Sequence, residues 1–218
     1  MSLEEKIKNY QEQFKGKVPK DVQDKMIKAT KELKKDNIKI DALKTGDEIL
    51  PFCLPNALGK KVMLQDELDK YSYVVINFYR GGWCPYCNLE LKALQDILHD
   101  LRVLNSTLIA ISPQTPDASL STKEKNELEF EVLSDWDNAV AKEFGLVFSL
   151  AKELRPIYES FKIDIPSANN DDSYELPMPA TYVLNKEGRI IYSFVDEDYT
   201  KRLEPQKILD AIKENEEL

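Results

Sequence analysis

A nearly continuous apolar run, YSYVVINFY at Tyr71–Tyr79, is followed at once by the sequence RGGWCPYCNLEL. A short and nearly continuous apolar run is typical of a β-strand that is buried on both faces of a sheet. Pro85 suits the first position of a helix because that position needs no N–H partner. We therefore expect a buried strand, a tight turn holding two cysteines, and a helix. Four leucines share one face of that expected helix: Leu91, Leu94, Leu98 and Leu101.

Further strands and helices alternate along the chain. Strands are expected at Ser106–Pro113 and Phe130–Asp135, and ATYVLNKEGRIIYSF is expected to form a hairpin that turns at Lys186–Gly188. TKEKNELE, NAVAKEFGL and EPQKILDAIKENEEL have helical patterns. This order predicts an α/β protein with a thioredoxin-like fold, in which helices flank a mixed central sheet.

Two amphipathic helices are expected before that domain, at residues 3–15 and 19–36, with GKVPKD as the turn between them. We predict a helical extension over residues 1–40 and a thioredoxin-like domain over residues 41–218. Residues 1–40 hold 11 lysines and 7 acidic residues, a net charge of +4, so the remainder carries −13. The extension is either a solvated helical face or a surface for a partner.

Composition excludes several classes of function. The net charge of −9 argues against nucleic acid and against anionic membrane surfaces as partners. The first residues, MSLEEKIKNYQEQF, lack the apolar core of a signal peptide, and no run approaches the roughly 18 apolar residues of a membrane span. We therefore expect a cytoplasmic protein. Three cysteines in 218 residues do not make a disulfide scaffold.

The pair Cys84 and Cys87 has the strongest chemical signal in the chain. Unpaired N–H groups and the helix dipole at a helix N-terminus stabilise a thiolate, and the spacing lets one sulfur attack an oxidised partner. A zinc site needs four ligands, and only Cys53 and the single histidine, His99, remain to complete it. Inert buried thiols are the other alternative. We favour redox chemistry and expect no metal or cofactor. We expect Cys53 to be a buried small apolar residue.

The turn and several distant segments resemble the alkyl hydroperoxide reductase / thiol-specific antioxidant (peroxiredoxin) family, in a branch with a CPYC motif. The resemblance runs from about Gly46 to Pro205. It rests on ILPFCLPNALGKKVML, FYRGGWCPYC, LIAISPQTPD, VLSDWDNAVAKEFGL, LPMPATYVLNKEGRI and DYTKRLEP.

The resemblance implies a role for each residue of the turn. Cys87 falls on the peroxidatic cysteine of the family and Glu90 on the acidic residue that follows it. Cys84 replaces the family's threonine, and Arg80 replaces its proline. The family's distant arginine would lie where this chain has Pro179.

The same residues also resemble thioredoxin, in which Trp-Cys-x-x-Cys is paired with a cis-proline before a strand. In that register Cys84 attacks, Cys87 resolves and the Met178–Pro179 bond is cis. Arg80 is either a surface charge or the cation that Pro179 no longer supplies. Trp83 is either a flat wall beside the thiols or an ordinary core aromatic residue.

The resemblance implies a thiol-dependent peroxidase that reduces hydrogen peroxide or organic hydroperoxides through Cys84 and Cys87. Thioredoxin or a similar dithiol would reduce the resulting disulfide. The alternatives are a protein disulfide oxidoreductase and a redox-sensing module. The appended hairpin and the resemblance are compatible with a homodimer.

Overall fold

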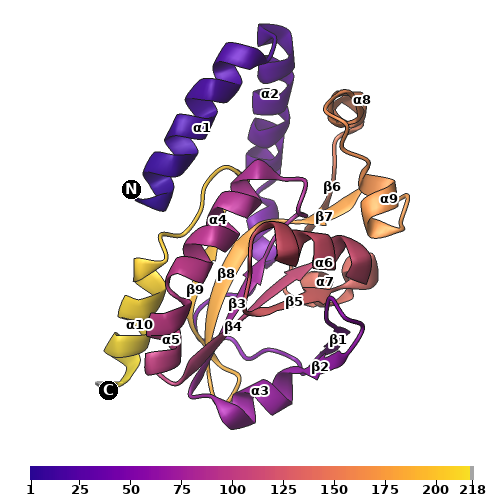
Figure 1. The fold of residues 1–218 in the computed structure, drawn as a ribbon. Coiled ribbons are helices and arrows are strands. Elements are labelled where there is room, and N and C mark those ends of the chain that lie inside the picture. The colour runs from indigo at the N-terminus through magenta and orange to yellow at the C-terminus, as the bar shows by residue number, and fades with distance from the viewer. Residues whose placement is uncertain (217–218) are drawn as a thin grey trace.

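The computed structural model describes residues 1–216, and its centre is a five-stranded mixed sheet with the order β5-β4-β3-β8-β9 (Figure 1). Strands β3, β4 and β5 are parallel, whereas β8 runs antiparallel to both β3 and β9. Every residue of β3 is buried, as the apolar run predicts. The thioredoxin-like fold is therefore confirmed. The bounds are Tyr73–Phe78 for β3, Ser106–Ser112 for β4, Glu131–Ser134 for β5, Ala180–Asn185 for β8 and Ile190–Val195 for β9.

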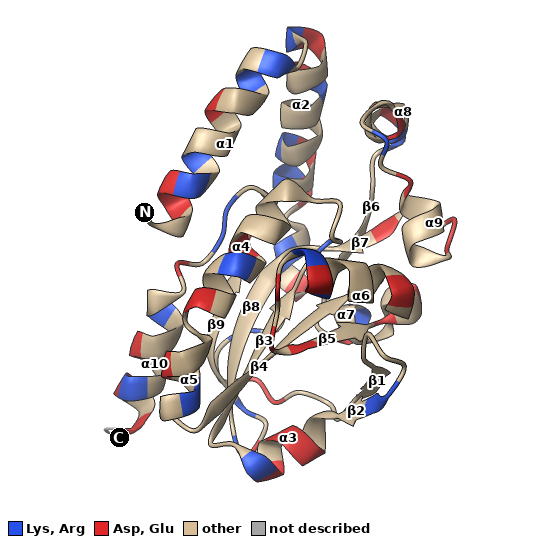
Figure 2. Cartoon of the chain, viewed as in Figure 1, with Lys and Arg blue, Asp and Glu red and all other residues tan. Residues whose placement is uncertain are grey.

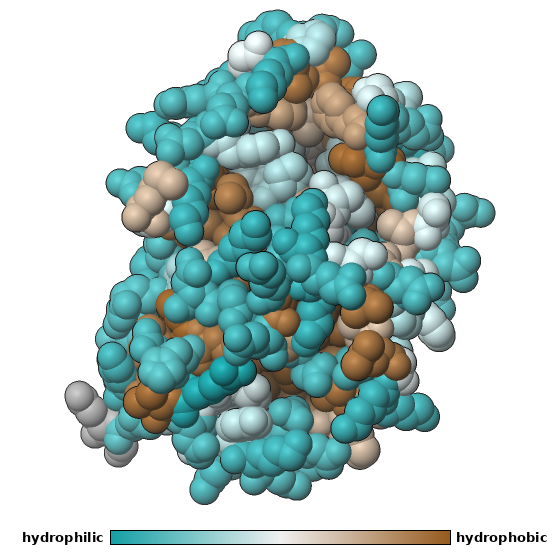
Figure 3. All heavy atoms as spheres, viewed as in Figure 1, coloured by the Kyte–Doolittle hydropathy of each residue, from teal (hydrophilic) through white to brown (hydrophobic). Residues whose placement is uncertain are grey.

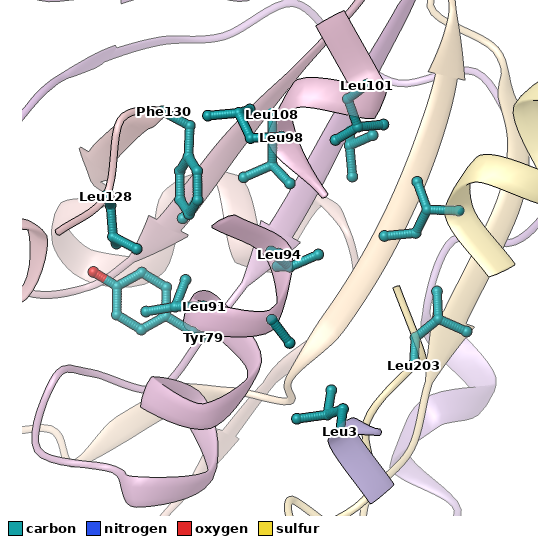
Figure 4. Packing of buried hydrophobic residues seen from close by; sticks show 14 of the residues in the cluster. Leu3, Tyr79, Leu91, Leu94, Leu98, Leu101, Leu108, Leu128, Phe130 and Leu203 are labelled. Carbon is teal, nitrogen blue, oxygen red and sulfur yellow. The ribbon is translucent and has the colours of Figure 1, made fainter. Parts of the chain in front are cut away.

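Helices cover both faces of this sheet. Alternate residues of β3 point to opposite faces: Val75 packs beneath α4, α5 and α10, and Ile76 packs on the side of α3 and α7. Figure 4 shows the first of these two clusters, in which the four expected leucines of α4 and α5 are all buried. The single helix expected there is wrong, because non-helical dihedral angles at Ile97 divide it in two. The helices are α3 Leu64–Lys70, α4 Pro85–Asp96, α5 Leu98–Val103, α6 Pro116–Lys125, α7 Ala139–Glu143 and α10 Gln206–Glu216.

The N-terminal hairpin consists of α1, Leu3–Lys17, and α2, Lys20–Asp36, followed by a short 3-10 helix η1, Ile38–Asp41. It stands over the N-terminal end of α4 (Figure 1). Lysines and acidic residues alternate along both helices (Figure 2), which favours a solvated outer face. The first backbone N–H groups of α1 donate to the Glu204 carboxylate: Leu3 N at 3.3 Å and Glu4 N at 2.5 Å. A carboxylate there satisfies free helix donors and complements the helix dipole.

Two smaller antiparallel sheets of two strands each flank the domain, and the sequence pattern did not predict their pairing. β1 pairs with β2 before α3, and β6 pairs with β7 in the loop-rich stretch before β8. Two short helices, α8 and α9, lie between β6 and β7. Within the described part of the chain, no helix is both long and apolar enough to cross a membrane. The remaining bounds are β1 Cys53–Pro55, β2 Lys61–Met63, η2 Trp136–Asn138, β6 Val147–Ser149, η3 Lys152–Leu154, α8 Arg155–Ser160, α9 Ile165–Asn169 and β7 Glu175–Pro177.

Candidate active site

The two cysteines lie at the N-terminus of α4, as the sequence predicts. Cys84 is the N-cap residue, Pro85 takes the first helical position, and Cys87 lies in the first turn. The first helical hydrogen bond runs from the Asn88 N–H to the Cys84 carbonyl at 3.1 Å. Both thiols are free and buried. The backbone N–H of Cys87, in the first turn of this helix, favours the thiolate form of Cys84.

The turn before Cys84 is held by polar side chains from neighbouring elements. The Gly82 N–H donates to Gln114 Oε1 at 2.7 Å, and Asn88 Nδ2 donates to the Gly82 carbonyl at 2.8 Å. Asn126 Nδ2 supports Asn88 from behind at 2.9 Å. A Cβ on Gly82 would lie 2.2 Å from Thr122 Oγ1, so only glycine allows this close approach. These contacts fix the backbone that positions the first thiol.

Arg80 is a buried residue with only 1% of its surface exposed, so its interpretation as a surface charge is wrong. Its guanidinium carbon lies 4.3 Å from the centre of the Tyr199 ring, 5.1 Å from Trp83 and 5.5 Å from Tyr158, whose hydroxyl accepts a hydrogen bond from it. Among residues 1–216 no carboxylate forms an ion pair with Arg80. A buried cation surrounded by ring faces attracts an anion, and the Cys84 thiolate is the anion nearby.

A second buried arginine, Arg202, contacts the other thiol. Its Nη2 donates to Cys87 Sγ at 3.3 Å, and its Nε lies 2.7 Å from Glu90 Oε2. Sequence reasoning missed Arg202, because the resemblance directed the search for an arginine to Pro179. The available signal was Glu90, an acidic residue on the apolar side of α4 that needs a cation once it is buried. Cys87 and Glu90 therefore share one cationic partner.

The pKa values of the two thiols are shifted in opposite directions. Burial alone raises the pKa of the Cys84 thiol, but the hydrogen bond from Cys87 and the charges of Arg80 and Arg202 outweigh it and lower the pKa to about 6. Burial and the hydrogen bond to Cys84 raise the pKa of Cys87 well above its usual range. Burial also raises the pKa of the Glu90 carboxyl to about 7, against the lowering by Arg202. The negative charge of the pair therefore rests on Cys84.

Cys84 opens onto a cavity of about 390 Å³, and Cys87 is not part of its lining. Trp83 forms one wall and meets Tyr158 edge to face, with ring centres 5.8 Å apart. Tyrosine, tryptophan and apolar side chains, pale or brown in Figure 3, gather between the hairpin and the body of the molecule. The cavity is lined by seven aromatic side chains: Tyr10, Phe14, Trp83, Tyr86, Tyr158, Phe161 and Tyr199.

Two expectations about other residues are wrong. The Met178–Pro179 bond is trans, since residues 1–216 contain no cis peptide bond. Pro179 is buried directly before β8, where Ala180 pairs with Phe78, so it lies at the sheet edge that bears the cysteine turn. Cys53 is exposed on β1, because that short strand belongs to a peripheral hairpin rather than to the core. His99, the remaining candidate zinc ligand, is exposed on α5.

A CPYC turn between a buried strand and a helix, on a thioredoxin-type sheet, is typical of redox-active proteins of the thioredoxin fold. The family model described as AhpC/TSA family matches residues 45–193. The chain belongs to this family and is a peroxiredoxin by its framework.

Known relatives match the central part of the chain. It is 36% identical over 107 residues to a putative peroxiredoxin bcp of Haemophilus influenzae. The aligned region covers 49% of this chain and 68% of the relative. It is 35% identical over 104 residues to a putative peroxiredoxin bcp of Buchnera aphidicola. Here the aligned region covers 48% of this chain and 65% of the relative, so the chain spans slightly less than two thirds of that relative's length. Neither match spans the whole chain.

Solved structures share the fold. Peroxidoxin BcpB from Mycobacterium tuberculosis superposes with a TM-score of 0.62 at 20% identity, covering 79% of this chain and 97% of the other. PrxQ from Xylella fastidiosa superposes with a TM-score of 0.63 at 16% identity, covering 80% and 98%. The family match begins at residue 45, after the N-terminal hairpin.

Proposed function

We propose that the protein is a thiol-dependent peroxidase in which Cys84 attacks the peroxide and Cys87 resolves the product. The Cys84 thiolate attacks one peroxide oxygen, the O–O bond breaks, and the alcohol or water leaves with a proton. The sulfenic acid on Cys84 then condenses with the Cys87 thiol, releases water and forms the disulfide. The observation that carries this proposal is that Cys84 both lines the cavity and has the lowered pKa.

This assignment of the two thiols differs from the alignment with the peroxiredoxin motif, in which Cys87 takes the position of the cysteine that attacks the peroxide. Three features favour Cys84: its place at the helix N-cap, the charge of Arg80, and its exposure to the cavity. Cys87 lies beneath it and contacts Arg202. This place suits a thiol that condenses with the sulfenic acid and is later released as a thiolate when the disulfide is reduced. Glu90 and Trp83 support these groups as a counter-charge and a cavity wall. Pro179 stays a proposed supporting residue.

The cavity volume supports a hydroperoxide with an organic body as well as hydrogen peroxide. A space of about 390 Å³ lies in the range of small-molecule sites, and its aromatic lining favours apolar groups. A thioredoxin-like dithiol is the proposed reductant. Cytoplasmic location, a homodimeric assembly and a domain boundary after residue 40 stay predictions; light scattering of the purified protein tests the dimer.

A stopped-flow titration with hydrogen peroxide tests the proposal. The reduced protein, Cys84→Ser and Cys87→Ser are compared in a Cys53→Ser background, which removes the exposed thiol. Trp83 beside the pair reports the reaction by its fluorescence, whereas the exposed Trp136 supplies a constant background.

We expect Cys84→Ser to abolish the fast phase and Cys87→Ser to retain it without forming a disulfide. The opposite pattern would assign the attack to Cys87. If no variant reacts faster than a free thiol, the peroxidase proposal is wrong.

A second function, reduction or oxidation of protein disulfides, is favoured by one observation. An N-cap cysteine with a lowered pKa, three residues before a buried cysteine of raised pKa, is the arrangement that thiol–disulfide exchange requires. Reduction of insulin with dithiothreitol as electron donor tests it. Turnover well above the dithiothreitol background, together with a slow peroxide reaction, would favour this function over the peroxidase.

A further inference from the structure

The N-terminal hairpin roofs the cavity above Cys84, and it lies outside the residues that match the family. From α1, Tyr10 meets Tyr86 edge to face with ring centres 5.1 Å apart, and Phe14 meets Phe161 in the same way at 6.2 Å. Beneath the hairpin, Cys84 has only 2% of its surface exposed. The reactive sulfur is therefore reached through the cavity rather than from an open surface.

The hairpin is held along its two outer sides. Leu3 and Ile7 of α1 are buried in the cluster that contains Leu94 and Leu203 (Figure 4), and Ala29 of α2 joins a separate cluster around α8. Ion pairs add to these apolar contacts. Lys34 lies 3.5 Å from both Asp196 and Asp198, and Lys39 lies 3.6 Å from Glu197.

Between these two sides the hairpin is incompletely packed: its aromatic contacts with the domain are interrupted by cavities. A second cavity of about 500 Å³ and a third of about 170 Å³ adjoin the one above Cys84. Tyr199 lines all three, and Arg80 lines two of them. A helical layer with few buried apolar contacts over its middle separates from the domain at a lower free energy than global unfolding. Layers of this kind open locally while a central sheet stays folded.

The two half-reactions of the proposed peroxidase need partners of different size. A hydroperoxide fits a cavity of about 390 Å³, but a folded domain of 100 residues has a radius of gyration of about 13 Å and does not. We propose that the hairpin occupies the surface on which a protein dithiol docks to reduce the Cys84–Cys87 disulfide. Small peroxides pass beneath the docked hairpin, and the protein reductant gains access only when the hairpin undocks.

The exchange step sets the geometric requirement. A thiolate of the dithiol attacks Cys84 Sγ, the Cys84–Cys87 bond breaks, and Cys87 leaves as a thiolate beside Arg202. The second thiol of the partner then attacks the mixed disulfide and releases Cys84. Two electrons and two protons pass from the dithiol to the pair. Because the attack requires direct contact between two sulfur atoms, the partner must occupy the space that Tyr10 and Phe14 now fill.

The test measures reduction of the disulfide by a small and a large dithiol. This inference rests on the proposed peroxidase, so the disulfide is formed with diamide instead of peroxide, and failure of the peroxidase shows only in the separate peroxide assay. Dithiothreitol is the small dithiol, and thioredoxin with its reductase and NADPH is the large one. The wild type is compared with Ile7→Ala, which weakens docking, and with Ile40→Ala, a matched control whose side chain is 72% exposed.

We expect thioredoxin to reduce Ile7→Ala about tenfold faster than the wild type, with less than about twofold change for dithiothreitol and no change in Ile40→Ala. Equal acceleration by both dithiols, or no acceleration by thioredoxin, would overturn the proposal. Should Ile7→Ala fail to fold, Lys34→Ala removes two ion pairs on the other side of the hairpin. It should accelerate reduction by thioredoxin alone, by about twofold, and an unchanged rate overturns the proposal equally.

Discussion

Replacing Arg80 with methionine is expected to raise the pKa of the Cys84 thiol and to slow its reaction with peroxide at neutral pH. With a pKa of about 6, Cys84 is ~90% thiolate at pH 7. A nearby opposite charge lowers a pKa by about 1 to 3 pH units, so its loss should leave Cys84 at most ~50% ionised. Methionine keeps most of the volume between the rings of Trp83, Tyr158 and Tyr199.

The sign of the pH dependence follows from the lowered pKa. The thiolate form is present above the folded pKa and is lost as pH falls through about 6, so wild-type reactivity should persist down to that pH. In Arg80→Met the same decline should begin above pH 7. The reason is that burial, which raises the pKa of this thiol, is then opposed by fewer positive charges.

The assay is the ultraviolet absorbance of the thiolate as a function of pH, recorded in a Cys53→Ser background. Arg155→Met is the matched control, because Arg155 also stacks on a tyrosine, Tyr174, at 4.0 Å, but acts on neither thiol of the pair. The control should titrate like the wild type. An unchanged midpoint in Arg80→Met would refute the argument that this arginine activates Cys84.

Three further outcomes are expected. The pKa of the Glu90 carboxyl is raised to about 7 in the folded protein, so its contribution to stability is full below pH ~4.5 and is lost as pH rises through 7. The free energy of unfolding in urea should therefore fall between pH 5 and 8, and this fall should be about 3 kcal/mol smaller in Glu90→Gln. Arg202→Met removes the donor to the leaving Cys87 thiolate and should slow reduction by dithiothreitol about tenfold, measured by single-turnover fluorescence. Leu91→Ala should cost about 2–5 kcal/mol in urea unfolding, whereas Leu58→Ala at an exposed position should cost little; equal losses would contradict the assigned core.

Features that depend on neighbouring residues along the chain were predictable from sequence. The apolar run predicted β3, and Pro85 together with the leucine spacing predicted a helix that begins at the cysteine pair. The two helices of the N-terminal hairpin followed from a 3.6-residue period. In each case hydrogen bonds and side-chain spacing within one segment determine the structure, so the pattern alone is informative.

Features that depend on contacts between distant segments were not predictable. Arg202 contacts Cys87 across 115 positions of sequence, and the segment DYTKRLEP does not by itself show that the two side chains meet. The burial of Arg80 depends on rings contributed by Tyr158 and Tyr199. The cavity likewise exists only because α1 lies over α4, a tertiary arrangement that amphipathic periodicity does not encode.

The carboxylate of Glu204 at the start of α1 has a consequence for how the protein is made. Glu204, whose side chain accepts the N–H groups of Leu3 and Glu4, is synthesised 201 and 200 positions after them. At about 5 to 20 residues per second, on the order of 10 s separate the appearance of the cysteine pair from that of Glu204. The contact that caps the start of α1 is therefore completed only after the cysteine pair has been synthesised.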